Sequence, residues 1–261
     1  MTEEGPRLSP SRLETYAGCS HAYYLEKVVR APERKAVWFI QGTAVHSGIE
    51  EYEKSFRTLT VDEALDRFEL KWSEELAAER EDEPDDEMWM VGGRRKLATD
   101  IEKRFEMGRQ QVADYIDRNP PGGDLRPAEI IPGEPAIEVG FELDFGEFRV
   151  IGYIDCVMED QNGLWFPIDW KTGSKLPVTP YQLGTYGVAL EELTGESVPW
   201  GAYWDCRNNE LVTRELHKYP KAVVENWYRK FYLGRLNEVY LPNPGEKCFT
   251  CTVKPSCEFA I

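Results

Sequence analysis

The sequence predicts an α/β protein in which a mixed β-sheet is flanked by helices and follows a helical subdomain. Two observations lead to this fold class. Between residues 136 and 217, apolar and β-branched runs alternate with short turns, which is typical of strands and hairpins. Before residue 120, apolar residues recur with helical spacing instead. The 261 residues, of which 41% are hydrophobic, are enough to bury a large core.

The N-terminal half is predicted to be mostly helical. Ser9 followed by Pro10 is a signal for a helix start, and this first short helix is expected to break near Gly18. Longer helices with an apolar stripe are predicted over residues 61–80 and 89–119, and another is predicted to start at or shortly before Thr43 and to reach Phe56. The acidic run from Glu79 to Glu87 contains a proline and is predicted to be a solvated loop.

The C-terminal half is predicted to hold the sheet. Strands are expected over residues 136–144, 148–159, 163–171, 198–206 and 210–217, with helices over 179–193 and 221–239. The turn between the second and third strands contains Asn162-Gly163, which favours a hairpin. The chain therefore predicts two hairpins joined by one helix, followed by a second helix.

Charged residues interrupt the first of these hairpins at one end. Asp155 lies on its first strand, and Asp169 and Lys171 lie two residues apart on the next, so both point to the same face. Two carboxylates and an ammonium are costly to bury without a partner. A divalent metal and an anion are the predicted occupants. A structural Asp–Lys ion pair at the sheet edge is the alternative.

The charge distribution leaves a nucleic-acid partner open although the net charge is −16. Residues 62–87 contain thirteen acids and three bases, so the remainder of the chain carries only −6. No apolar run of about eighteen residues is present, so no membrane span is expected. The polar start of the chain is not typical of a secretory signal, so we expect a cytoplasmic setting.

Six cysteines in a reducing setting favour metal ligation or free thiols over disulfides. Three of them follow C-x2-C-x5-C spacing in the tail: Cys248, Cys251 and Cys257. Cys19 is the candidate for a fourth ligand, which would tie the N-terminal helix to the tail. Cys156 and Cys206 lie in predicted strands and are expected in the core. The spacing leaves zinc, an iron–sulfur cluster and free thiols open.

Four short motifs occur in order along the chain. They are GTAVH ending at His46, GYID ending at Asp155, IDWK with Asp169 and Lys171, and QLGTY from Gln182 to Tyr186. Together with the cysteines, they resemble the RecB-type branch of the PD-(D/E)XK nuclease superfamily. More narrowly, the chain resembles the iron–sulfur-containing exonucleases of that branch, which include the CRISPR-adaptation nuclease and many phage relatives.

The resemblance implies a restriction-endonuclease-like core, a [4Fe–4S] cluster on the four cysteines and a Mg²⁺ or Mn²⁺ centre. It implies an exonuclease that acts on single-stranded DNA ends, commonly 5′ to 3′, in the host cytoplasm if the protein is phage-encoded. CRISPR-adaptation or recombination proteins would be its partners. The expected divisions are an N-terminal helical segment (1–35), a helical subdomain (36–125), a nuclease core (126–241) and a cysteine tail (242–261).

The resemblance also implies roles for single residues. Asp155 and Asp169 would hold the metal, with a nitrogen of His46 and the backbone carbonyl of Trp170, and Glu138 is a possible additional acid. The Trp170 ring is expected either to stack on a base or to be an ordinary core residue.

Three further residues would act around the metal. Lys171 would orient the attacking water or stabilise charge developing on phosphorus. Gln182 and Tyr186 would position the DNA strand, with helix packing as the alternative for both. Other readings of the whole chain are a non-catalytic DNA-binding or assembly scaffold, a zinc-stapled DNA-binding protein, and an endonuclease.

Overall fold

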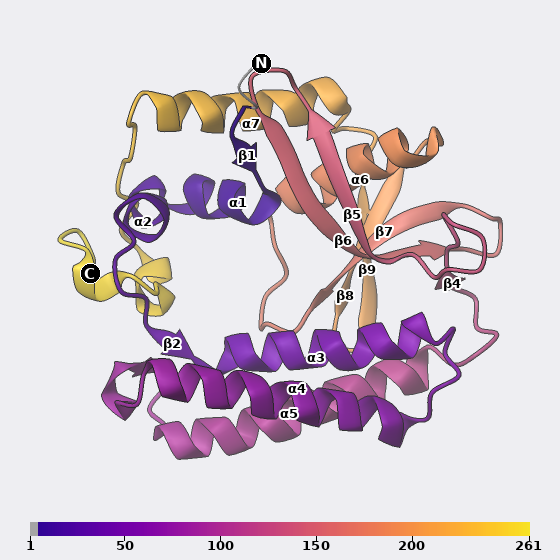
Figure 1. Ribbon diagram of the computed structural model, residues 1–261, viewed down its shortest axis with the longest axis horizontal. Coiled ribbons are helices and arrows are strands. Elements are labelled where there is room, and N and C mark those ends of the chain that lie inside the picture. The colour runs from indigo at the N-terminus through magenta and orange to yellow at the C-terminus, as the bar shows by residue number, and fades with distance from the viewer. Residues whose placement is uncertain (1–4) are drawn as a thin grey trace.

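The computed structural model describes residues 5–261, so the first four residues of the predicted N-terminal segment lie outside the described residues. A mixed seven-stranded sheet runs through the described part of the chain, with helices on both faces (Figure 1). Its strands are β1 (Arg7–Leu8), β4 (Arg126–Pro127), β5 (Ile137–Asp144), β6 (Arg149–Glu159), β7 (Trp165–Lys171), β8 (Trp200–Asp205) and β9 (Glu210–Glu215). The α/β class with a mixed sheet is thus confirmed.

β6 is the central strand of this sheet. It pairs with β1 in parallel and with β4, β5 and β7 in antiparallel orientation, and the path continues through β8 to β9. β7 and β8 are parallel, and α6 (Tyr181–Thr194) forms the crossover that a parallel pair requires. Both predicted hairpins, β6–β7 and β8–β9, are present.

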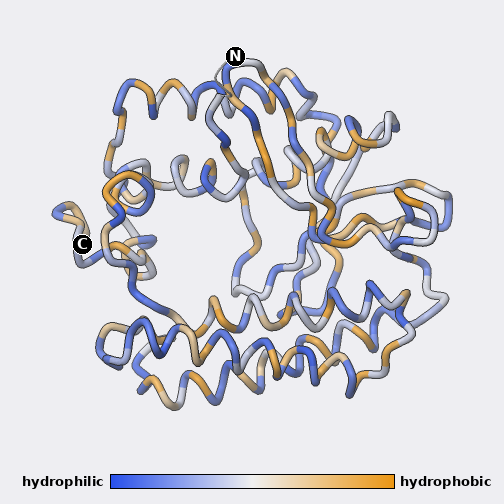
Figure 2. Tube along the Cα trace, in the orientation of Figure 1, coloured by the Kyte–Doolittle hydropathy of each residue, from blue (hydrophilic) through white to orange (hydrophobic). Residues whose placement is uncertain are grey.

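Two helical layers cover the sheet. α3 (Val37–Lys54), α4 (Val61–Asp82) and α5 (Leu97–Arg118) form the layer drawn at the bottom of Figure 1. α1 (Pro10–Gly18), α6 and α7 (Lys221–Leu236) pack on the other face. Figure 2 shows hydrophobic residues concentrated in the central strands, whereas along the helices they alternate with hydrophilic ones. Each layer therefore buries one apolar helix face against the sheet.

The predicted helix starts are partly right. Ser9 caps α1 with its hydroxyl, and α1 ends at Gly18. The predicted helix over 89–119 begins later, at Leu97, because β3 (Trp89–Met90) pairs with β2 (Lys35–Ala36) and Gly93 turns the chain with φ 73°. None of the helices in residues 5–261 combines the length and apolarity of a membrane span.

Two other predicted boundaries are wrong. The first four residues of the expected acidic loop still belong to α4, where Glu79 and Asp82 pair with Lys35 at 2.8 and 2.5 Å. A short 3-10 turn, η2 (Asp86–Met88), follows. The helix expected to reach Phe56 ends at Lys54, and Phe56 is 41% exposed because the chain turns there in the left-handed region, with φ 54°.

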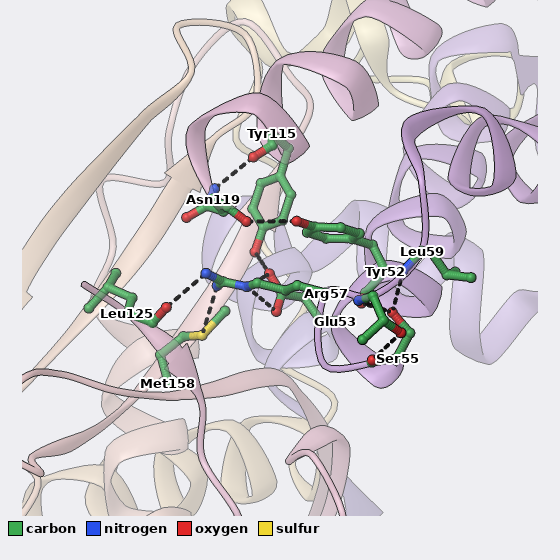
Figure 3. Close-up of polar contacts among 10 residues, drawn as sticks. Tyr52, Glu53, Ser55, Arg57, Leu59, Tyr115, Asn119, Leu125 and Met158 are labelled. Atoms are coloured by element: carbon green, nitrogen blue, oxygen red, sulfur yellow. Dashed lines mark hydrogen bonds and ion pairs between the residues drawn. The ribbon is translucent and has the colours of Figure 1, made fainter. Parts of the chain in front are cut away.

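A buried ion pair joins the helical layer to the sheet (Figure 3). The Arg57 Nε donates to both carboxylate oxygens of Glu53, at 2.8 and 3.1 Å, and Tyr115 donates to the same carboxylate at 2.6 Å. Arg57 also donates to the Leu125 carbonyl at 2.7 Å and reaches the Met158 sulfur on β6. This network fixes the end of α3 against the strand that carries Asp155.

The C-terminal tail lies beside the segment that follows α1. The tail, with its turns η3 (Glu246–Thr250) and η4 (Lys254–Ser256), sits beside α2 (Ser20–Tyr23) and the π-helical turn η1 (Tyr24–Val29) (Figure 1). His21 N donates to the Leu241 carbonyl at 3.2 Å, and Arg34 N donates to the Thr252 carbonyl at 2.9 Å. Backbone contacts therefore already join the segments that carry the N-terminal and tail cysteines.

Candidate active site

The central acidic residues lie where two strands separate. The β6–β7 ladder ends at the pair Cys156–Ile168, and Asp155 and Asp169 are the next residue on each strand. On the other side of β6, Glu138 adopts a left-handed backbone with φ 52°, between the paired residues Ile137 and Val139. A non-glycine residue held in this conformation is strained, and such residues cluster at functional sites. We call this divergence of β6 and β7 the fork. It brings the carboxylates of Asp155 and Asp169 close enough to interact.

Asp155 bridges the fork. Its Oδ2 accepts a hydrogen bond from the Trp170 backbone amide at 3.1 Å and lies 3.5 Å from the His46 Nδ1. The residue is only 8% exposed. Burial raises the pKa of Asp155 well above its ordinary value, and the nearby Asp169 carboxylate raises it further, while Lys171 opposes this. The site favours a proton or a cation at this carboxyl.

Asp169 and Lys171 lie on the α6 side of β7. The Lys171 ammonium is 2.6 Å from the Asp169 Oδ2, a buried oxygen without a hydrogen bond of good geometry in the described residues. Lys171 also donates to the Gln182 Oε1 at 2.9 Å, and the Gln182 amide donates to the Tyr186 hydroxyl at 3.0 Å. Gln182 and Tyr186 therefore hold the lysine side chain in place.

His46 approaches the fork from α3, on the opposite layer. Its Nε2 lies 2.7 Å from the Trp170 carbonyl, and because a carbonyl can only accept, Nε2 carries the proton. Burial lowers the pKa of His46, with Asp169 acting in the opposite direction. A neutral imidazole then directs its unprotonated Nδ1 toward Asp155.

Glu138 and Glu50 form an acidic pair beside the fork. Burial raises the pKa of Glu138 to about 7, and the neighbouring Glu50 carboxylate is the next largest cause. Asp169 also raises this pKa, while Lys54 lowers it. Sequence reasoning did not assign Glu50 to the site. Its signal was the spacing of four residues from His46, which puts both on one face of α3.

The Trp170 side chain belongs to the core. It is 1% exposed, and its ring meets Tyr115 and His46 edge-on at centroid distances of 6.2 and 5.7 Å. The expectation that it stacks on a base is therefore wrong, and the alternative of a core residue is confirmed. Trp170 contributes its backbone: its amide contacts Asp155, and its carbonyl contacts His46.

The donor set at the fork suits a hard divalent cation. Carboxylate and carbonyl oxygens are ligands of Mg²⁺ and Mn²⁺, and the imidazole nitrogen adds a ligand type that first-row transition metals such as Mn²⁺ accept. Within residues 5–261, however, no three His, Cys, Asp or Glu side chains are placed as a ready ligand group.

The candidate cluster cysteines likewise form no ready ligand group within residues 5–261. Cys19 and Cys248 accept backbone amides, from Asn243 at 3.4 Å and from Gly245 at 3.5 Å. Burial raises the pKa of Cys251, and Cys19 and Cys257 add to this shift, so these three thiols share one region. Cys156 and Cys206 are buried in the core, as predicted.

A cleft of about 1280 Å³ opens from this site, between the start of α3, the β3–α5 segment, the loop after β7 and the tail. Its described lining contains no acidic residue. The basic lining residues are Arg34, Arg95, Lys103, Arg104, Lys171, Lys175 and Arg207. A cleft this basic in a chain of net charge −16 indicates an anionic partner.

The two aspartates and the lysine therefore lie beside a basic cleft, an arrangement that suits a divalent cation and an anionic partner. The chain matches the family model of the PD-(D/E)XK nuclease superfamily over residues 7–258 and belongs to that superfamily. It is thus a member of a nuclease family, as the motifs indicated.

Similar proteins occur in two mycobacteriophages and in a bacterium. The chain is 31% identical to the Gene 69 protein of Mycobacterium phage D29, covering 97% of this chain and 96% of that protein. It is 29% identical to the Gene 69 protein of Mycobacterium phage L5 with the same coverage. It is 28% identical to an ATP-dependent helicase/deoxyribonuclease subunit of Ruminiclostridium cellulolyticum, over 80% of this chain but 19% of that protein.

Proposed function

We propose that this protein is a metal-dependent DNA nuclease, and that it is an exonuclease that hydrolyses phosphodiester bonds at single-stranded ends. The observation that carries the proposal is the meeting of Asp155, Asp169, Lys171 and His46 at one end of a cleft lined by basic residues. The printed name of the Ruminiclostridium relative, which includes the word deoxyribonuclease, supports DNA as the polymer.

In the proposed site, Asp155 and Asp169 would hold Mg²⁺ or Mn²⁺ together with His46 and the Trp170 carbonyl, and Glu138 would add a nearby carboxylate. The bound ion supplies a Lewis acid that polarises a phosphate oxygen and lowers the pKa of water. The neutral imidazole of His46 has a lone pair to offer because its pKa is lowered by burial.

Lys171 orients the attacking water or stabilises charge on the phosphoryl oxygens. Gln182 and Tyr186 act through Lys171, because one amide group links the Lys171 ammonium to the Tyr186 hydroxyl. This differs from a direct role of the pair in holding the DNA strand. Both residues would hold the Lys171 ammonium beside Asp169.

The cysteines Cys19, Cys248, Cys251 and Cys257 are proposed to carry a [4Fe–4S] cluster. The proximity of three of these thiols and the backbone contacts between α2 and the tail support this. Iron and acid-labile sulfide in anaerobically purified protein, lost in Cys251→Ser, would be expected. Zinc without acid-labile sulfide would show instead that these cysteines hold a zinc ion.

Direction and biological setting rest on the resemblance to iron–sulfur-containing exonucleases and on the phage relatives. The proposed polarity is 5′ to 3′, the setting is the cytoplasm of a bacterial host, and recombination or CRISPR-adaptation proteins are the proposed partners. End-labelled DNA reports the polarity directly. Circular single-stranded DNA distinguishes an exonuclease from an endonuclease, since an exonuclease cannot begin on it.

The decisive test is Mn²⁺-dependent degradation of end-labelled linear single-stranded DNA by anaerobically purified protein. Lys171→Met keeps the length of the side chain and removes its charge, and the exposed Lys230 on α7, changed in the same way, is the matched control. We expect degradation by the wild type and Lys230→Met but not by Lys171→Met. Full activity of Lys171→Met would refute the site. DNA binding without any cleavage by the wild type would favour the non-catalytic scaffold.

A further inference from the structure

The cleft beside the active site contains exposed aromatic rings as well as basic groups. Phe39, in the first turn of α3, is 52% exposed, and Phe249, on η3 of the tail, is 68% exposed. Both line the cleft that also contains His46 and Lys171. Exposing a large apolar ring is unfavourable in isolation, and two such rings in one basic cleft indicate a partner with flat apolar faces and negative charge.

The structure holds each ring at a fixed place. Phe39 belongs to the helix that carries His46, seven residues further along, and its ring meets the Trp38 ring edge-on at 5.8 Å. Trp38 in turn packs under the Arg104 guanidinium, whose carbon lies 5.2 Å from the ring centroid. The basic and aromatic groups on this wall of the cleft are therefore interleaved.

Phe249 is presented by the cysteine tail, because it lies between Cys248 and Cys251. The Arg34 guanidinium donates to the Cys251 carbonyl at 2.9 Å, and the Arg34 amide donates to the Thr252 carbonyl at 2.9 Å. The Lys254 ammonium lies 5.3 Å from the centroid of the Phe249 ring. The turn that carries Phe249 is thus anchored to Arg34, the residue that directly precedes β2.

We propose that Phe39 and Phe249 stack on unpaired bases of a single DNA strand, and that the cysteine tail is thereby a substrate-gripping wall of the cleft. This inference rests on the proposed nuclease function and deepens it. Basic side chains hold the phosphates, while the rings select strands whose bases are free to stack, since paired bases offer no open face. A protein partner is less consistent with the cleft, because the lining has no acidic side chain to meet a partner's basic groups and several basic ones that would repel them.

Binding without cleavage tests this inference. Fluorescence anisotropy in EDTA would compare a labelled oligothymidylate with an abasic oligonucleotide of equal length. Wild-type protein should bind the base-bearing strand more tightly. Phe39→Ala and Phe249→Ala should each weaken that binding by about 5- to 150-fold and leave the affinity for the abasic strand unchanged. Tryptophan at either position should restore it.

Phe56, at the far end of α3, is the matched control because it is exposed and does not line the cleft, so Phe56→Ala should bind both strands as the wild type does. Equal wild-type affinity for the two strands would overturn the inference, whether or not a variant folds. So would phenylalanine variants that bind oligothymidylate normally or lose both strands equally. Normal Mn²⁺-dependent cleavage in those cases would leave the nuclease function standing, whereas a wild type that neither binds nor cuts DNA would refute both.

Discussion

Removing the Arg57 side chain should destabilise the protein strongly, although Arg57 is not part of the proposed active site. Arg57 is 4% exposed and Glu53 is fully buried, so Arg57→Ala leaves a buried carboxylate with Tyr115 as its one remaining donor among the described residues. Breaking a buried ion pair in this way costs about 3–5 kcal/mol. Domains of this kind have total stabilities of about 5–15 kcal/mol, so the effect would be large.

Urea unfolding followed by tryptophan fluorescence would measure the change in the free energy of unfolding. The double variant Glu53→Gln/Arg57→Met is the control, because it removes both charges and keeps a group that Tyr115 can contact. Replacing both partners should recover stability to within about 2 kcal/mol of the wild type. If Arg57→Ala and the double variant have the same free energy of unfolding, the loss comes from packing, and the argument from an unpaired charge is refuted.

The pH dependence gives an independent check. Burial raises the pKa of Glu53, whereas Arg57 lowers it, so removing Arg57 lets this pKa rise further. A carboxyl whose folded pKa is raised contributes stability below its unfolded pKa and loses it as pH rises through the folded pKa. Arg57→Ala should therefore lose least relative to the wild type in mild acid. A penalty that does not change with pH would contradict this.

Two further predictions concern the site and its support. Because the pKa of Glu138 is raised to about 7, the metal-free protein should lose stability as pH rises from about 4.5 to 7. Glu138→Gln should reduce this dependence of the free energy of unfolding on pH, measured in EDTA. An unchanged dependence would show that the pKa of Glu138 is not raised in the folded state. Gln111 is buried, accepts from Gln41 at 2.8 Å and donates to the carbonyl of Thr172, the residue after the proposed catalytic lysine, at 3.2 Å. Gln111→Ala should lower the free energy of unfolding in urea by about 1–3 kcal/mol and lower kcat more than KM, whereas the change of its exposed neighbour, Gln110→Ala, should do neither. Equal effects of the two changes would show that the hydrogen bonds of Gln111 do not support the site.

The sequence by itself determined the local elements and the order of the motifs. Strand alternation put Asp169 and Lys171 on one face, and the Asn162-Gly163 turn paired their strand with the one that carries Asp155. These properties depend on near neighbours, so they can be predicted from the chain alone. The helix boundaries near residues 56 and 89 failed because β2–β3 pairing and left-handed residues override periodicity there.

Only the tertiary structure decided what the site is made of and what surrounds it. Glu50 joins Glu138 beside the fork, Gln182 holds Lys171, and the Trp170 ring is buried, because these outcomes depend on contacts between separate layers. The same holds for the cleft. Folding leaves no acidic side chain in the described lining of the cleft and brings together basic groups and rings from five separate segments, a charge separation that neither the net charge nor any local pattern encodes.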